Sequence, residues 1–151
     1  GLDLSSQFTL WNRIFGQVRY SYLRGEDLKN KEPLVFMPAN SLYGSVAYRV
    51  LKPIKISKKT KLDALEFEVN NRYVFKQTNL LVDQDFVLPP AAYNLLGLKV
   101  STNIIFSKYK MRFFAKADNL LNTNYRDYLN RQRYFADDTG VSLIFGLNFK
   151  F

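Results

Sequence analysis

The chain has 151 residues, with 22 Lys or Arg, 13 Asp or Glu and no His, so its formal net charge is +9. With neither Cys nor His, the chain cannot by itself build a disulfide, a zinc finger, a thiol nucleophile or a Ser-His-Asp triad. Any catalysis would have to use carboxylates, lysines or tyrosines. For this chain we expect no enzyme, no metal site and no cofactor.

Apolar and polar residues alternate along almost the whole chain, a pattern typical of strands with two chemically different faces. In chain order, the alternation predicts strands at 8–24, 40–51, 61–77, 93–106, 109–119 and 139–151. The predicted links are long at 25–39, 77–92 and 120–138, intermediate at 52–60, and a tight turn at 107–108. Every Pro falls in a link or at a strand entrance. The pattern predicts one all-β domain, an antiparallel up-and-down meander of about six strands.

The length of the predicted strands helps to decide whether their apolar side faces a protein core or membrane lipid. A strand that crosses a membrane needs about 9–11 residues, whereas a typical soluble strand has about 5–6. The alternation of long and short links is also typical of outer-membrane barrels. Tyrosines near predicted strand ends fit an interfacial aromatic girdle or are ordinary strand aromatics: Tyr22, Tyr43, Tyr93 and Tyr109.

Six strands do not close a lipid-facing barrel, because the smallest common ones have about 8. An open sheet edge in hydrocarbon would leave backbone N–H and C=O groups without partners. We therefore expect a barrel segment whose other strands come from a longer polypeptide or from another chain. No apolar run predicts a transmembrane helix, and the first residues lack the regions of a signal peptide, so we expect a mature chain or one that begins in mid-protein.

Residues 119–135, Asn-Leu-Leu-Asn-Thr-Asn-Tyr-Arg-Asp-Tyr-Leu-Asn-Arg-Gln-Arg-Tyr-Phe, resemble the closing segment of TonB-dependent outer-membrane receptors. In that family an Asn-Leu-Phe-Asn/Asp element ends the penultimate strand, a Tyr follows, and a Gly opens a final strand that ends in Phe. The matching residues are Asn119, Leu120, Leu121, Asn122, Tyr125, Gly140 and Phe151. The family's Arg after that Gly is Val141 here. A second stretch, Tyr-Ser-Tyr-Leu-Arg-Gly-Glu at 20–26 followed by a Pro-led run at 33–38, is similar to an earlier strand and loop of the family.

The resemblance covers nearly all of residues 1–151 and implies the C-terminal part of a 22-stranded transmembrane β-barrel. It implies a receptor in the outer membrane of a Gram-negative bacterium that takes up a scarce small-molecule nutrient, most commonly a ferric siderophore or other iron complex. The implied partners are outer-membrane lipid, the remaining barrel strands, a plug domain, the TonB complex acting through that plug, and the barrel assembly machinery. Neither the plug nor the TonB-contacting segment is recognisable within this chain.

With the C-terminus on the periplasmic side, as in the family, the long links would be extracellular loops and 52–60 and 107–108 would face the periplasm. The last loop carries the candidate ligand-binding residues, because Arg binds carboxylate or phosphate and aromatic rings stack on planar ligands. These candidates are Tyr125, Arg126, Tyr128, Arg131, Arg133 and Tyr134. The alternative is that the same side chains only pack the loop, since three Asp balance its three Arg.

Three further groups of charged residues are weaker candidates. Asp83 and Asp85 would suit a hard cation, although an exposed, solvated loop is the favoured interpretation. Glu66 and Glu68 share a predicted strand face with Arg72 and are expected to bind water, to pair with Arg or to touch the plug. The 52–60 link contains Lys52, Lys55, Lys58 and Lys59 without an acid; we favour a solvated turn facing a lipid surface or the plug, and expect no nucleic-acid partner.

The final predicted strand has the clearest alternation, with an apolar residue at every second position: Val141, Leu143, Phe145, Leu147, Phe149 and Phe151. Its apolar face and aromatic last residue resemble the C-terminal signal that the outer-membrane assembly machinery reads by strand pairing. We predict that role for these six residues.

Two other functional classes stay open at this point. One is a passive outer-membrane channel or structural barrel without energy coupling, which a search for an upstream plug would distinguish. The other is a soluble β-sandwich that binds acidic partners through its positive charge, which partitioning between detergent and buffer would distinguish.

Overall fold

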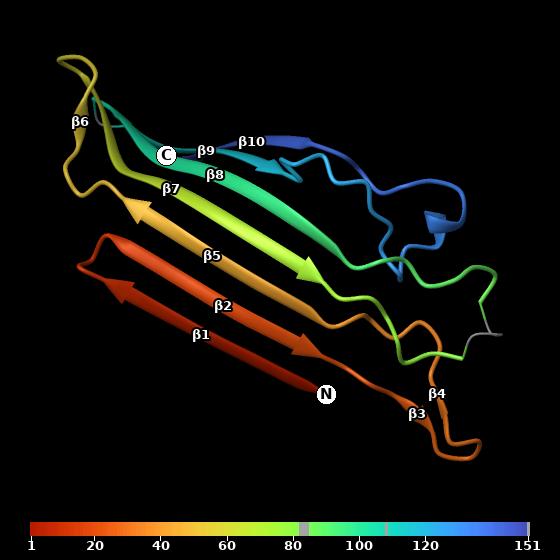
Figure 1. Ribbon diagram of the computed structural model, residues 1–151. Coiled ribbons are helices and arrows are strands. Elements are labelled where there is room, and N and C mark those ends of the chain that lie inside the picture. The colour runs from red at the N-terminus through yellow and green to blue at the C-terminus, as the bar shows by residue number, and fades with distance from the viewer. Residues whose placement is uncertain (82–84, 108, 151) are drawn as a thin grey trace.

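The computed structural model describes residues 1–81, 85–107 and 109–150, and it confirms an all-β, antiparallel, up-and-down sheet (Figure 1). The long strands are β1 (Leu2–Leu10), β2 (Ile14–Tyr22), β5 (Ser41–Arg49), β7 (Thr60–Val74), β8 (Tyr93–Phe106), β9 (Tyr109–Asp118) and β10 (Ser142–Lys150). The short elements are β3 (Glu26–Asp27), β4 (Glu32–Pro33), β6 (Ile54–Lys55) and a 3₁₀ helix, Arg131–Tyr134. No helix in the described ranges is long and apolar enough to cross a membrane.

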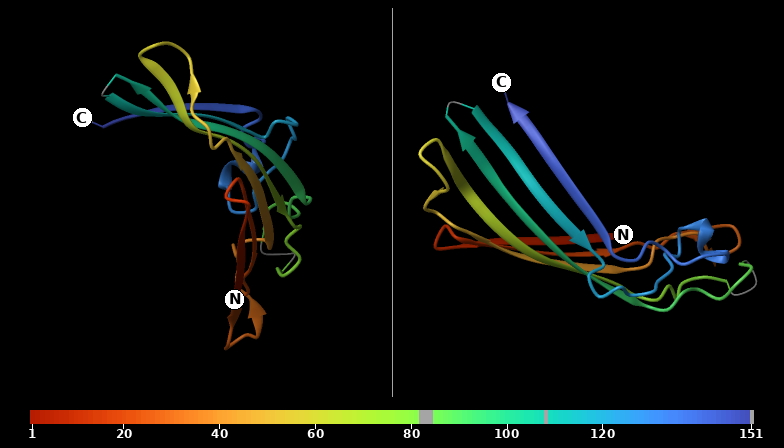
Figure 2. Two further views of the ribbon diagram at one scale, coloured as in Figure 1. Left: turned by 90° about the vertical axis from the view of Figure 1, so that its left-hand side faces the viewer. Right: turned by 90° about the horizontal axis from the view of Figure 1, so that it is seen from above.

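The long strands lie in the sheet in the order β1-β2-β5-β7-β8-β9-β10, each antiparallel to the next. Figure 2 shows that the sheet curves through a wide arc between its two edges. It does not close, because β1 and β10 each pair on one side only within the described part of the chain. The open sheet is shown; that it belongs to a 22-stranded barrel stays a prediction.

The prediction of one strand over 8–24 is wrong, because the chain reverses after Leu10 and forms the β1–β2 hairpin. Trp11 and Asn12 have φ angles of 49° and 55°, the left-handed conformation that both central residues of a type I′ turn adopt. The Arg13 N–H donates a 3.0 Å hydrogen bond to the Leu10 carbonyl and closes the turn. The described sheet therefore has seven long strands, and the N-terminal nine-residue strand pairs with β2.

The strands are 9 to 15 residues long, within or above the length that a membrane-spanning strand needs. The longest, β7, contains a bulge between Asp63 and Glu66, where Ala64 has a φ of 50°. The Thr102 hydroxyl donates to the Asp63 carbonyl at 3.1 Å across the bulge. The bulge adds one residue to β7 and keeps its apolar side chains on one face both before and after it.

Cross-strand register sorts the side chains onto two faces of different chemistry. We call one the apolar face; its residues in the four central strands are Leu42, Val46, Tyr48, Phe67, Val69, Tyr73, Leu96, Leu98, Val100, Ile104, Phe106, Met111, Phe113, Ala115 and Ala117. The outer strands continue it with Leu4, Phe8, Val18, Leu143, Phe145, Leu147 and Phe149. No residue that the register places on this face is charged.

The opposite side, which we call the polar face, carries the charged side chains of the same strands. Among them are Arg19, Arg49, Glu66, Glu68, Arg72, Lys99, Arg112 and Lys116. Arg49 pairs with Glu66 at 2.7 Å, and Lys99 pairs with Glu68 at 3.4 Å. Glu66 and Glu68 therefore share a face with Arg72, as predicted; Glu66 pairs with an Arg, that of β5, and Glu68 pairs with a Lys of β8.

The apolar face is uncovered. Leu143, Phe145 and Leu147 of β10 are 64%, 67% and 70% exposed, and Val46 and Val69 in the middle of the sheet are about half exposed. The fully buried apolar residues of the described chain are few: Ala47, Val74, Tyr93 and Tyr128. The apolar side chains thus do not form the core of a globule within the described residues.

The two ends of the strands also differ (Figure 1). At one end, which we call the turn end, are the β1–β2 turn, the hairpin that joins β6 to β7, and the β8–β9 turn. At the other, the loop end, are the links 23–40, 75–92 and 119–141, which match the three long predicted loops.

Of the four tyrosines proposed as a girdle, only Tyr22 and Tyr109 lie on the apolar face; Tyr43 and Tyr93 lie on the polar face.

Candidate binding site in the loop cluster

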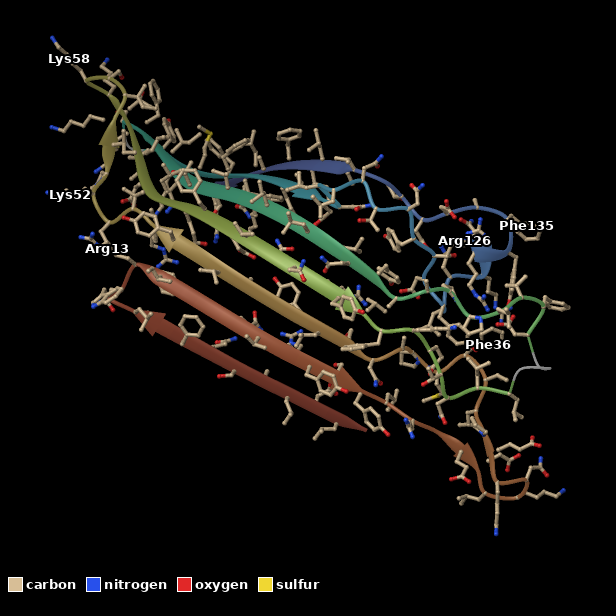
Figure 3. All side chains as sticks on the ribbon, viewed as in Figure 1. Arg13, Phe36, Lys52, Lys58, Arg126 and Phe135 are labelled. Atoms are coloured by element: carbon tan, nitrogen blue, oxygen red, sulfur yellow. The ribbon has the colours of Figure 1, made fainter. Side chains whose placement is uncertain are left out.

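The three long links pack against one another at the loop end, and we call their described residues the loop cluster. Phe36, Arg126 and Phe135, labelled in Figure 3, come from two of these links and lie at this end. The Gln77 side chain donates to the Met37 and Pro38 carbonyls at 2.8 and 3.1 Å and so joins the second link to the first.

The chain enters the last link through a turn built by two asparagines. Asn119 and Asn122 have φ angles of 53° and 49°, a left-handed conformation that Asn tolerates better than most residues. The buried Asn119 side chain exchanges hydrogen bonds with the backbone of Thr123, both at 2.9 Å. Asn122 accepts from the Val141 N–H at 3.3 Å, which joins the two ends of the link. The Asn-Leu-Leu-Asn element thus has a structural role here.

The center of the loop cluster is a buried arginine clamp, which we define as Asp85, Tyr128, Arg133 and Tyr134. Arg133 is 1% exposed and forms an ion pair with the Asp85 carboxylate, whose side chain is 6% exposed. Its guanidinium lies over two rings, 4.9 Å from the center of Tyr128 and 4.6 Å from that of Tyr134. The Tyr134 hydroxyl donates to Asp85 at 2.6 Å. Arg133 Nε and Nη1 have no hydrogen-bond partner among the described residues.

The charges of the clamp stabilise one another. Burial would raise the pKa of Asp85, but hydrogen bonds from Tyr134 and Arg133 and the charge of Arg133 hold that pKa below its ordinary value of 3.8. The hydrogen bond to the Asp85 carboxylate, together with burial, raises the pKa of Tyr134 above 10.0. At neutral pH the carboxylate is therefore ionised and the phenol is protonated, the forms that the observed hydrogen bonds require.

A second set of contacts holds the last link against the polar face of the sheet. The rings of Tyr93, the first residue of β8, and Tyr125 lie 4.6 Å apart, and the Tyr93 hydroxyl donates to Asp127 at 2.7 Å. Burial and the carboxylates of Asp138 and Asp127 raise the pKa of Tyr125. Because Tyr93 is on the polar face, this link covers the loop end of that face and leaves the apolar face free.

A cavity of about 60 Å³ lies between the loop cluster and the strands, lined by residues that include Arg72, Gln77, Tyr93, Arg126 and Tyr128. This volume suits a few water molecules, since one water needs roughly 10–15 Å³. The cavity is too small for a siderophore or a haem. A larger hollow of about 390 Å³ is open to solvent beside the last link, with a lining that includes Arg72, Lys116 and Tyr125.

The candidate ligand-binding residues divide into two groups in the structure. Arg133 and Tyr128 are buried in the clamp, and Tyr134 and Tyr125 are partly buried in the contacts described above. Arg126 and Arg131 are exposed: Arg126 pairs with Asp137 at 2.5 Å, and Arg131 lies over the Phe36 ring at 5.4 Å. Arg126 and Arg131 are thus the two candidates with exposed charged groups.

The proposed solvated acidic pair is partly outside the described residues, since Asp83 is not among them. Asp85 is described, and its burial against Arg133 contradicts the expectation of a solvated side chain. In the described chain, no three His, Cys, Asp or Glu side chains come together as metal ligands. Phe36 and Phe86 contribute to the loop cluster but were not among the candidates, and Asp85 was considered only for a cation, because contacts between separate loops leave no local sequence signal.

The predicted assembly signal lies at an open edge of the sheet. Leu143, Phe145, Leu147 and Phe149 point to the apolar face of β10, whose outer edge pairs with no described strand. Val141 precedes the strand and is exposed, and Phe151 lies outside the described residues. Tyr109 and Phe149 stack at 6.3 Å near the turn end of this edge.

Comparison with known proteins identified no relative: no family model, no curated protein and no solved structure matches the chain. Its fold and its sites therefore rest on its own residues.

Proposed function

We propose that this chain is a C-terminal wall segment of an outer-membrane TonB-dependent receptor, which takes up a scarce nutrient such as an iron complex. The apolar face would contact acyl chains, the polar face would line the interior, and the loop cluster would lie outside the cell. Further strands, a plug domain and the TonB complex would act with it. The activity is binding and translocation, with no covalent step.

The observation that carries the proposal is the exposed apolar face, which lacks charged residues across all seven long strands. Exposed apolar surfaces of this extent mark protein or membrane contacts. The opposite face carries several charged side chains, as the interior of outer-membrane barrels does. Short turns at one end and long links at the other are also typical of such barrels.

The loop cluster supports the receptor proposal over a passive channel. Its links fold over the loop end of the polar face, and a buried ion pair holds their positions relative to one another. A surface with fixed exposed groups, such as Arg126 and Arg131, loses less entropy on binding a ligand than mobile loops do. Arginines of this kind suit an anionic ligand, a property of many metal chelates.

The test is energy-coupled uptake by the full-length protein in its own outer membrane. We expect the protein in the outer-membrane fraction, and a strain that lacks it should grow more slowly when the nutrient is scarce. Loss of TonB should produce the same growth defect, and the double mutant should be no worse than either single mutant. If uptake persists without TonB, the protein is a passive channel; if the protein remains in the soluble fraction, the membrane assignment is wrong.

A further inference from the structure

The hairpin at the turn end is a second surface with unusual chemistry. Its strand β6 pairs with the start of β7, so that Ile54 is opposite Leu62 and Lys55 is opposite Lys61. Figure 1 shows the hairpin rising beyond the end of β5. Between residues 50 and 62 it has five lysines and no acid: Lys52, Lys55, Lys58, Lys59 and Lys61.

These positive charges are not neutralised within the described protein. None of the five lysines forms an ion pair with a described residue, and the nearest acid along the chain, Asp63, makes no salt bridge with them. Lys55 and Lys61 are directly opposite each other across two strands, an arrangement of like charges that is destabilising by itself. The hairpin therefore fits a partner that supplies negative charge.

The apolar side chains of the hairpin continue the apolar face of the sheet. Ile54 is opposite Leu62, and Leu62 is opposite Ile104, so the three form one row on that face. Ile54 and Ile56 are 43% and 62% exposed. Lys55 and Lys61 lie on the polar face, whereas Lys58 and Lys59 lie at the tip of the hairpin, so the tip lysines can meet negative charge next to this apolar row.

The lysines surround a hollow that is open to solvent. It measures about 680 Å³, and its lining includes Lys58 and Lys59 at the tip together with Lys55, Lys61 and Ile105 on the polar face. Figure 3 shows Lys58 at the tip of the hairpin, with Lys52 and Arg13 also at the turn end. Long lysine side chains keep their charges in the headgroup region while their stems lie along apolar surface.

We propose that the β6–β7 hairpin binds anionic phospholipid headgroups at the membrane surface on the turn side. The proposal rests on the proposed function, since it needs the apolar face to be in lipid. It goes beyond that function because it specifies that the bound lipid is anionic and that it binds at the turn end of the sheet. An acidic surface elsewhere in the protein is the alternative partner that the test must distinguish.

The test measures lipid selectivity of the full-length protein reconstituted in phosphatidylcholine bilayers. Spin-labelled phosphatidylglycerol and spin-labelled phosphatidylcholine report the association constants of the two lipids at the protein surface. The wild type should prefer phosphatidylglycerol, and 0.5 M NaCl should weaken this preference. A lysine near an anionic surface contributes about 1 kcal/mol, which is about fivefold. The Lys58→Gln/Lys59→Gln variant should therefore lower the preference by up to roughly 30-fold.

The matched control is the Lys29→Gln/Lys31→Gln variant at the tip of the β3–β4 hairpin. That tip also has two exposed lysines, but three acids lie close to them in sequence: Glu26, Asp27 and Glu32. This control and the charge-conserving Lys58→Arg/Lys59→Arg variant should keep the wild-type selectivity. Equal selectivity in wild type and in the Lys58→Gln/Lys59→Gln variant would overturn the proposal.

Two other outcomes would show whether the lipid proposal or the proposed function is wrong. If the Lys58→Gln/Lys59→Gln variant melts at a lower temperature but keeps its selectivity, the lysines face acids of the protein and the lipid proposal is wrong. If neither spin-labelled lipid is immobilised by the wild-type protein, the apolar face does not contact lipid, and the proposed function itself is contradicted.

Discussion

The apolar and the polar face of the sheet share one backbone, yet only the polar face carries charged side chains. Exposed leucines and phenylalanines cover one side of β10, while the other side carries Ser142, Ile144, Gly146 and Asn148. The last link packs on the polar face, through Tyr93.

This difference shows that the two faces are adapted to different surroundings. Strand geometry is common to both and does not account for the separation of charge. A face in hydrocarbon excludes charged groups, whereas a face lined by water and loops accommodates ion pairs such as Arg49–Glu66. This interpretation can be tested with pairs of variants that carry the same substitution, one on the apolar and one on the polar face, or one at the turn end and one at the loop end.

The largest effect is expected in the arginine clamp. Replacing Asp85 by Ala leaves Arg133 buried without its partner, and removal of one member of a buried pair typically costs about 3–5 kcal/mol. We expect Asp85→Ala to remove the hydrogen-exchange protection of amides 126–138 in the full-length protein, with β8 and β9 still protected. The control is Asp137→Ala, since the Arg126–Asp137 pair is 43% and 47% exposed and should contribute about 0–1 kcal/mol. Equal effects of the two variants would contradict the clamp.

The next largest effect compares neighbouring residues of β5 on the two faces. Val46 is on the apolar face and Ser45 is on the polar face. In a bilayer, Val46→Arg should lower the free energy of unfolding by about 2–4 kcal/mol, the usual cost of a lipid-facing arginine. Ser45→Arg should change it by about 0.5 kcal/mol, as most surface substitutions do. Urea titration in vesicles measures both; a small effect of Val46→Arg would mean that water already surrounds that face.

A third comparison uses a packing feature that both faces share. Gly16 on the apolar face lies under the ring of Phe8, and Gly146 on the polar face lies under that of Phe114. A methyl group at either glycine would collide with the ring, and overpacking of this kind costs about 1–3 kcal/mol. Gly16→Ala and Gly146→Ala should therefore destabilise the protein by similar amounts in urea titrations. A large difference between them would mean that one ring moves aside freely.

A smaller effect is expected from acid. The unfolded chain binds a proton at Asp85 near pH 3.8, whereas the folded clamp binds it only at lower pH. Between the folded and the unfolded pKa of Asp85, unfolding of the loop cluster therefore takes up a proton. The contribution of Asp85 to stability is complete above pH 3.8 and is lost as the pH falls through the folded pKa. Exchange protection of the loop cluster should be constant between pH 5 and 8 and decline below pH 3.8. The Asp85→Asn variant should lack this decline.

Much of the sheet could be predicted from sequence because register follows alternation. The apolar face of β10 agrees with the alternation predicted for this strand. The β1–β2 hairpin was missed for a geometric reason. Leu10 is opposite Ile14, so even-numbered residues stay on one face before and after the turn and the period of two continues without a break. The only local signals were Trp11 and Asn12, and Trp rarely adopts a left-handed conformation.

The loop cluster was less predictable because its contacts join residues far apart in the chain. The candidate arginines of the last link were selected for their chemistry, but Arg133 is buried by a partner 48 positions earlier. The balance of Arg and Asp within that link suggested internal pairing, and this holds for Arg126 and Asp137. Nothing local distinguishes these two cases, since both involve an Arg in a polar, aromatic-rich stretch.

The central claim is that the apolar face contacts lipid, and nitroxide accessibility along β8 tests it most directly. The chain has no native Cys, so single cysteines at positions 96–101 label one site each in this segment. In reconstituted membranes, labels at Leu96, Leu98 and Val100 should collide mainly with oxygen, and labels at Gly97, Lys99 and Ser101 mainly with a water-soluble nickel chelate. Accessibility to nickel at all six positions, or an alternation of the opposite phase, would contradict the account.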